Sequence, residues 1–283
     1  MQAVRPAAVA GMFYPEAPAA LTSAVREFLA QAAQRGDGSA PPKALIVPHA
    51  GYVYSGPIAA SAYACIAPSR AKIRRVVLLG PVHRVPIRGL ALPLAKAFAT
   101  PLGTIEVDAN AVTEALALPQ VRTSEAAHAL EHALEVQLPF LQTILESFRI
   151  VPFAVGDATA AEVAAVIDRL WGGAETLILV SSDLSHYHPY DEARAIDRGT
   201  VEEILALTSA IDHKQACGAT PINGFAVCAR RRGLVGELLD LRNSGDTAGD
   251  KSRVVGYAAF AFTERAGTNA RHAVATVEEE VVA

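Results

Sequence analysis

The sequence is poor in cysteine, with only Cys65, Cys217 and Cys228 among 283 residues. An odd number of cysteines without paired spacing argues against a disulfide framework, and chains of this kind are typical of a reducing, cytoplasmic compartment. No apolar run approaches the roughly 20 residues that span a bilayer, and the first residues lack the charged and apolar regions of a signal peptide. We therefore expect a cytoplasmic protein that does not associate with membranes.

An excess of positive charge is also missing. The formal net charge is −4, and the 25 basic and 29 acidic residues are mixed along the chain. The short basic run 230–232 ends an apolar helical pattern, where it complements the negative end of the helix dipole. Since no basic stripe is present, a nucleic-acid-binding role has little electrostatic support.

What the chain has in abundance is apolar residues, which make up 51% of it. Runs rich in Val, Ile and Leu alternate with stretches of helical spacing, as in parallel sheets buried on both faces. We expect strands at 44–47, 76–79, 149–155, 176–180 and 253–263. We expect helices at 21–33, 57–66, 108–117, 127–147, 160–170, 191–207 and 221–232, with an extended excursion over 90–104.

This alternation predicts an α/β fold: one domain with a mostly parallel central sheet flanked by helices. The length suits a single large domain. We assign residues 1–265 to that domain, because the apolar pattern is lost beyond it. Residues 266–283 are predicted to form a polar C-terminal tail.

Polar side chains follow three of the predicted strands at the point where each strand ends. His49 comes after the strand 44–47, and His83 comes shortly after 76–79. Asp183 and His186 follow 176–180 in the same way. Because ligands bind at the carboxyl ends of strands in open α/β sheets, we expect these four side chains to gather at one edge.

The chemistry of these four residues suits a metal site or acid–base catalysis. For a single histidine, a backbone hydrogen bond at the strand end is the simpler interpretation, but the arrangement recurs at His49 and His83. Neutral imidazoles are common ligands of divalent transition metals. Asp183 and His186 could form a carboxylate–imidazole pair that acts as a general acid or base, although either Asp183 or Ser182 could instead cap a helix.

Cys217 lies just before the helix expected at 221–232. A thiol at a helix N-terminus is a plausible metal ligand or nucleophile. A small buried apolar residue is an equally good interpretation from the sequence alone. The sequence therefore leaves the role of this cysteine open.

The segment 128–132 reads H-x-x-E-H, the pattern of inverted zinc peptidases. On one helix, His128 and His132 would share a face. The pattern is short, and Glu135, a possible third ligand one turn on, would crowd the same helix, so we prefer a polar helix start whose leucines face the core. A zinc peptidase built on these two histidines remains an alternative hypothesis.

Five segments together resemble the Memo family, called AmmeMemoRadiSam system protein B in bacteria and archaea. The resemblance runs in order from residue 5 to about 263, through 5–15, 48–56, 80–83, 131–139 and 182–186. It implies a fold similar to the class III extradiol dioxygenases, with a non-haem iron site at the strand ends. It also implies that His49, His83 and Cys217 are metal ligands, with Asp183 and His186 as acid–base groups beside them.

The implied function is that of a metal-dependent, dioxygenase-like oxidoreductase that uses Fe(II). Ring-cleaving dioxygenases complete their site with a carboxylate, whereas the third position here is Cys217. A softer thiolate could favour copper or zinc and makes catechol cleavage a poor expectation. The alternative is a non-catalytic metal-binding scaffold or peptide-binding protein, acting with the radical-SAM and AMMECR1-like partners that the family name implies. In either case the expected ligand is a small molecule or a peptide.

Overall fold

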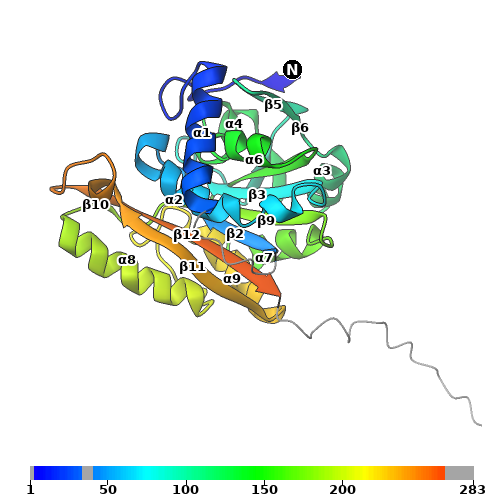
Figure 1. Cartoon of the computed structure of the whole chain (residues 1–283). Helices are drawn as coiled ribbons and strands as arrows, with labels where there is room; N and C mark the ends of the chain where they lie inside the picture. The colour runs from blue at the N-terminus through cyan, green and yellow to red at the C-terminus, as the bar shows by residue number, and fades with distance from the viewer. Residues whose placement is uncertain (1–2, 34–40, 265–283) are drawn as a thin grey trace, which may run out of the picture.

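A mixed sheet forms the middle layer of the molecule in the computed structural model, which describes residues 3–33 and 41–264 (Figure 1). Its strands follow the order β10-β12-β2-β9-β3-β8-β4-β7, and β11 pairs with β12. A small second sheet has the order β1-β5-β6. The strands are β1 (Val4–Arg5), β2 (Ala44–Val47), β3 (Arg75–Pro81), β4 (Leu90–Leu92), β5 (Ala97–Thr100), β6 (Gly103–Glu106), β7 (Val121–Thr123), β8 (Arg149–Val155), β9 (Thr176–Ser181), β10 (His186–His188), β11 (Leu234–Asn243) and β12 (Val254–Glu264).

Helices cover both faces of the large sheet. They are α1 (Pro18–Ala33), α2 (Tyr52–Ala64), α3 (Ala109–Leu116), α4 (Glu125–Ala129), α5 (His132–Glu135), α6 (Leu138–Ile144), α7 (Ala160–Arg169), α8 (Tyr190–Leu205) and α9 (Ala219–Arg231). The predicted α/β fold with a helix-flanked sheet is confirmed. In the described ranges, no helix has the length and apolar character needed to cross a membrane.

The four central strands β2, β9, β3 and β8 run parallel to one another. They are the apolar runs that the sequence marked as buried strands. Alternate residues of β3 enter two different cores: Val77 and Leu79 pack with α7 and α9, whereas Val76 and Leu78 pack on the side of α1 and α2. Because the strands are parallel, the carboxyl ends of β2, β3 and β9 meet at one edge of the sheet.

The predicted helix over 127–147 is wrong, because this stretch forms the three short helices α4, α5 and α6. The chain leaves helical geometry at Glu131, whose backbone is extended (φ −78°, ψ 126°). Its carboxylate accepts a hydrogen bond from the backbone N–H of Ala133 and so caps α5. The break turns the residues around Glu131 toward the carboxyl edge of the sheet.

Two other elements differ from the sequence-based prediction. Helix α2 begins at Tyr52, five residues before the expected start, and contains Pro57 inside it. Strand β11 was not predicted, and it pairs antiparallel with β12 along almost its whole length. The expected tail 266–283 lies outside the described residues.

Candidate metal centre

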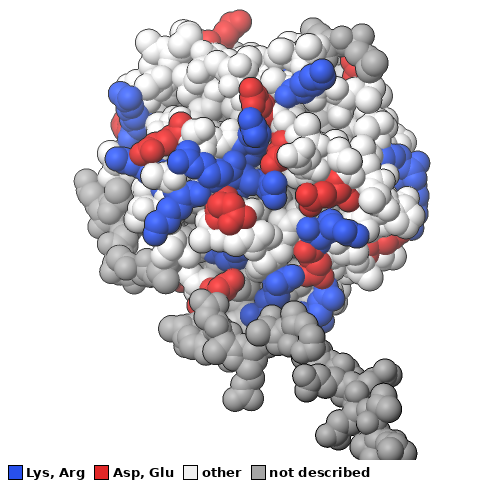
Figure 2. Space-filling model, turned by 90° about the vertical axis from the view of Figure 1, so that its right-hand side faces the viewer, with Lys and Arg blue, Asp and Glu red and all other residues white. Residues whose placement is uncertain are grey.

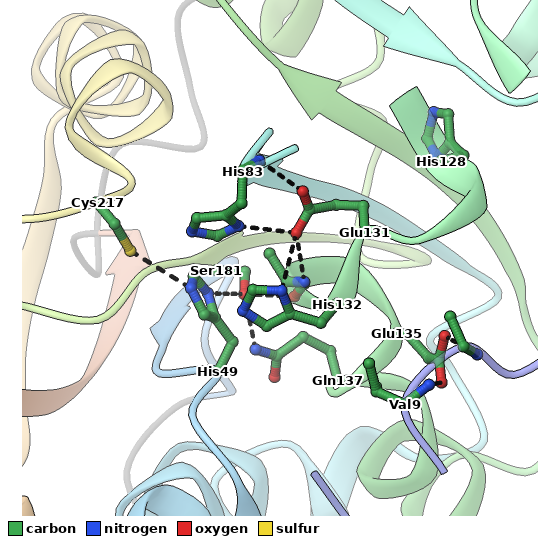
Figure 3. Close-up of polar contacts among 12 residues, drawn as sticks. Val9, His49, His83, His128, Glu131, His132, Glu135, Gln137, Ser181 and Cys217 are labelled. Atoms are coloured by element: carbon green, nitrogen blue, oxygen red, sulfur yellow. Dashed lines mark hydrogen bonds and ion pairs between the residues drawn. The ribbon is translucent and has the colours of Figure 1, made fainter. Parts of the chain in front are cut away.

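Three imidazoles meet at the carboxyl edge of the sheet (Figure 3). His49 follows β2, His83 follows β3, and His132 begins α5. One ring nitrogen from each of the three lies within 4.8 Å of the others. The ring of His132 stacks on that of His83 with centroids 4.5 Å apart, and it meets the ring of His49 edge-on at 5.3 Å. Imidazole nitrogens this close, on separate elements, can bind a common metal ion.

Hydrogen bonds fix the tautomer of His49, which is almost completely buried. Ser181 Oγ donates its one proton to the carbonyl of Ala133 (2.7 Å) and accepts from the side-chain amide of Gln137 (2.8 Å). His49 Nδ1 lies 2.9 Å from the same oxygen, so this nitrogen must be the donor. The lone pair of His49 is therefore on Nε2, free for a metal.

A buried carboxylate fixes His83 in the same way. Glu131 accepts from His83 Nδ1 at 2.8 Å and from the backbone N–H of His83 at 2.6 Å. Burial alone would raise the pKa of Glu131, but the hydrogen bonds from His83 and Ala133 outweigh it and lower the pKa to about 2. An ionised carboxylate on Nδ1–H is the usual support of a metal-binding histidine, and it leaves Nε2 of His83 available.

The thiol of Cys217 borders the imidazole cluster. Its Sγ lies 3.4 Å from Nε2 of His49 and 3.7 Å from the carbonyl oxygen of Asp183. Burial raises the pKa of this thiol to about 12 in the metal-free protein. Two ligands of one tetrahedral zinc ion, one sulfur and one nitrogen, would be about 3.5 Å apart. The Cys217–His49 pair already has that spacing.

Asp183 supports the loop that carries His49. Its carboxylate is buried, a condition that raises its pKa, and Oδ1 accepts from the backbone N–H of His49 at 2.7 Å. The neighbouring His186 interacts with Asp183 through their charges, and no hydrogen bond joins the two side chains in the described part of the chain. The structure therefore gives Asp183 a positioning contact with His49 that the sequence did not suggest.

His186 lies on the short strand β10, at the border of the same edge. The strand pairs with β12, and the backbone N–H of Ser185 donates to the buried carboxylate of Asp197 at 3.0 Å. The next residue, Tyr187, has a positive φ of 64°, which is unusual for a side chain of this size. These contacts hold the backbone around His186 in one conformation beside the cluster.

His128 lies away from the other three histidines (Figure 3). It belongs to α4, whereas His132 begins α5, and its buried Nε2 bonds to the carbonyl of Ala91 at 2.9 Å. The H-x-x-E-H pattern therefore does not pair two ligands on one helix, and the zinc peptidase hypothesis loses its basis. Sequence reasoning noticed His132 only in that pattern and missed its place beside His49 and His83.

The N-terminal segment packs against the cluster, and Glu135 anchors this segment. The carboxylate of Glu135 is fully buried and accepts from Arg5 (2.5 Å), the hydroxyl of Tyr14 (2.6 Å) and two backbone N–H groups of the same segment. This anchoring places the ring of Phe13 at a centroid distance of 4.6 Å from His132. A structural carboxylate one helical turn from His132 thus fixes the surroundings of the imidazole cluster.

The opposite edge of the sheet, where the parallel strands begin, has a different character. A cavity of about 690 Å³ lies there, lined by arginines and carboxylates that include Arg75, Asp108, Arg149 and Glu106. Arg75 pairs with Asp108, and Arg149 with Glu106. Figure 2, which faces this edge, shows the positive and negative side chains intermingled. Among the described residues that line this cavity there is neither a histidine nor a cysteine, so it holds nothing comparable to the imidazole cluster.

Comparisons with known proteins match nearly the whole chain. The family model described as Memo-like protein matches residues 5–261. A MEMO1 family protein of Methanopyrus kandleri is 37% identical, over 91% of this chain and 98% of its own length. MEMO1 family proteins of Aquifex aeolicus and Aeropyrum pernix are 37% and 38% identical, over 92% and 90% of this chain and 99% and 98% of their own lengths.

Proposed function

Because the chain belongs to the Memo family, we propose that it is a metal-dependent oxidoreductase whose ion is held by His49, His83 and Cys217. The observation that carries this proposal is the convergence of imidazole nitrogens whose tautomers are already set. Two neutral imidazoles and a thiol suit Fe(II), copper or zinc and do not suit magnesium or calcium, which prefer oxygen ligands. We take Fe(II) as the first candidate.

A redox metal would supply the electron transfer that none of these side chains provides. The protein's own groups would hold and surround it: Glu131 and Ser181 keep the two ligating nitrogens deprotonated. His186, at the border of the cluster, is the group we assign to moving a proton. The buried Asp183 would keep the His49 loop in place during turnover.

The third ligand is assigned to Cys217 because of its spacing from His49 Nε2, at 3.4 Å. His132 is the competing donor, since its ring nitrogen, unlike the sulfur of Cys217, belongs to the group of ligand atoms that all lie within 4.8 Å of one another. Nδ1 of His132 is 3.4 Å from the carboxylate of Glu131, a weaker orientation than that of His83. We assign His132 to the neighbouring position, where it can serve as a fourth donor.

Metal content tests the proposal directly. The wild-type protein, purified without added metal and analysed for its elements, should hold roughly one transition-metal ion per chain. His49→Ala should lower this content at least tenfold, because a ligand is lost. His188→Ala is the matched control, since that imidazole is partly exposed and pairs with Glu192 on the surface. Equal and negligible metal in the wild type and His49→Ala would overturn the proposal.

Cobalt substitution tests the third ligand. Co(II) bound to the wild-type protein should give the near-ultraviolet band of thiolate-to-metal charge transfer, and Cys217→Ser should lose it. His132→Asn should keep the band, because the sulfur is untouched. A band that survives Cys217→Ser and disappears in His132→Asn would move the third position to the histidine.

The proposal extends to a cytoplasmic protein that works with radical-SAM and AMMECR1-like partners, an expectation that rests on the family resemblance. Consumption of O₂ distinguishes a scaffold from an oxidoreductase. The iron-loaded oxidoreductase should consume O₂ in the presence of a thiol or phenol reductant, with loss of that activity in His186→Gln. Full metal loading without O₂ consumption would favour the scaffold.

A further inference from the structure

Strand β11 forms an open edge of the large sheet (Figure 1). It is 10 residues long, and its pairing partner among the described strands is β12 alone. Its side chains pack on one face toward α8 and on the other toward α2. A long strand with one unpaired side can serve as a template on which another extended chain pairs.

The neighbouring strands show which backbone groups of β11 face the open side. Phe262 of β12 lies opposite Gly236, and its carbonyl oxygen accepts from the backbone N–H of Lys43 at 2.8 Å, on the side of β2. Phe262 therefore points its backbone groups away from β11. In an antiparallel pair, the N–H and C=O of Gly236 then point to the open side, and those of Leu238 do the same.

The irregularity in β11 changes the spacing of these outward groups. The backbone N–H of Asn243 donates to Asp246 and not to β12, so Asn243 also points outward, as does Leu241 two residues earlier. The register with β12 shifts between Leu238 and Asp240. Leu238 and Leu241 are therefore successive outward residues three positions apart. A regular strand repeats its outward groups every second residue and cannot match this step.

A second copy of β11 does match it. When the two strands run antiparallel about a twofold axis at the irregularity, Leu238 of each chain lies opposite Leu241 of the other, and the two longer steps coincide. Leu238 and Leu241 pack half-buried against the same core, so they project from the same face of the strand, as opposed residues must. The dimer would cover the exposed parts of these leucines.

The charges on β11 fit the same register, which places the exposed Glu237 of each chain opposite Arg242 of the other. Arg242 uses Nε and Nη2 to bind Asp240 of its own chain and keeps Nη1 for a second carboxylate. Asp240 accepts from Ser61 of α2, which puts Arg242 on the α2 face. Glu237, adjacent to Leu238, projects from that face too. Charges and bulges usually keep edge strands apart, but here each is matched by its own copy.

We propose that two chains associate through β11 in a twofold dimer, with the large sheet continuous across the interface. The occupant of the edge is a second copy of this chain, because it carries both the same step at the irregularity and the reciprocal charges. None of the proposed metal ligands belongs to β11, so the dimer does not depend on the proposed oxidoreductase function.

Sedimentation equilibrium of the full chain tests the association. From low to high micromolar concentration, the mass should rise toward twice 29.7 kDa. Glu237→Arg should raise the dissociation constant at least about tenfold, because two attractive contacts become repulsive. The control Glu114→Arg makes the same charge change on α3, which packs on β7 at the other end of the sheet, and should have no effect. A monomer at every concentration, or an unchanged dimer in Glu237→Arg, would overturn the proposal.

A disulfide tests the register. In the double variant Glu237→Cys with Arg242→Cys, opposed cysteines should link the two chains on mild oxidation, because the Cα atoms of such a pair lie about 4.5 Å apart. Non-reducing electrophoresis detects the covalent dimer, and the wild type measures any linkage through the native cysteines. Each single variant lacks an opposed cysteine and should behave like the wild type. A double variant that forms no covalent dimer, or a single variant that forms as much, would overturn this pairing.

Discussion

Replacing Glu135 by Ala should lower the free energy of unfolding by about 3–5 kcal/mol. The carboxylate is fully buried, and its loss leaves the guanidinium of Arg5, itself only 5% exposed, without its ionic partner. It also removes the acceptor of the Tyr14 hydroxyl and of two backbone N–H groups. Urea unfolding of the metal-free protein, followed by the fluorescence of the buried Trp171, measures the change.

A double variant separates the ion pair from the rest of the network. Arg5→Met combined with Glu135→Leu should cost less than the sum of the two single changes, because neither charge is left buried and unpaired. The control Glu192→Ala removes an exposed carboxylate and should change the stability by less than about 0.5 kcal/mol. A loss below about 1 kcal/mol for Glu135→Ala would contradict the anchoring role.

Replacing Glu131 by Gln should weaken metal binding about 10- to 100-fold. The amide keeps the shape of the side chain but removes the charge that supports Nδ1–H of His83. The two carboxylate oxygens accept from the ring and from the backbone N–H of His83. The glutamine amide offers one neutral oxygen and one NH₂ group in their place, so one of these two donors would face an NH₂ group. Competition with a chelator of known affinity gives the dissociation constant of the metal for each variant.

The chain offers a close control for this change. His188 Nδ1 lies 2.8 Å from Glu192, the same contact in a partly exposed setting that does not involve the imidazole cluster. Glu192→Gln should leave the metal affinity unchanged. If Glu131→Gln alters the affinity by less than about threefold, orientation of His83 by its carboxylate is not what makes the site bind.

The strand ends of the site could be predicted from the sequence because they depend on a local pattern. Uninterrupted apolar runs mark parallel strands, and the rules of open α/β sheets bring their carboxyl ends together. His49 and His83 follow from that reasoning without any structure. The assignment of Cys217 came from the family resemblance, and its role as a ligand stays a prediction.

His132 could not be placed in the same way. The leucines of 127–147 continue the helical spacing, so the apolar pattern gave no sign of the break at Glu131. That break depends on two contacts of the Glu131 carboxylate. One is a tertiary hydrogen bond from His83, and the other is the capping hydrogen bond from Ala133. The extended backbone at Glu131 turns His132 toward the sheet, and apolar periodicity alone cannot predict that turn.

Strand β11 was missed for a related reason. Glu237, Asp240 and Arg242 interrupt its apolar residues, and most of its side chains are half-buried. Its identity as a strand depends on antiparallel pairing with β12, including an irregularity between Leu238 and Asp240. A strand whose identity depends on its pairing partner leaves little trace in a local window.

The Arg5–Glu135 contact joins residues that are 130 positions apart in the chain. During synthesis the first segment leaves the ribosome long before its anchor exists, since domains are made from the N-terminus onward. Residues 5–14 therefore cannot form their contacts with Glu135 until α5 has been made, and Ser181, which sets His49, comes later still. A nascent chain that ends before Ser181 would expose its histidines separately to metal ions. The complete site would form only late in translation.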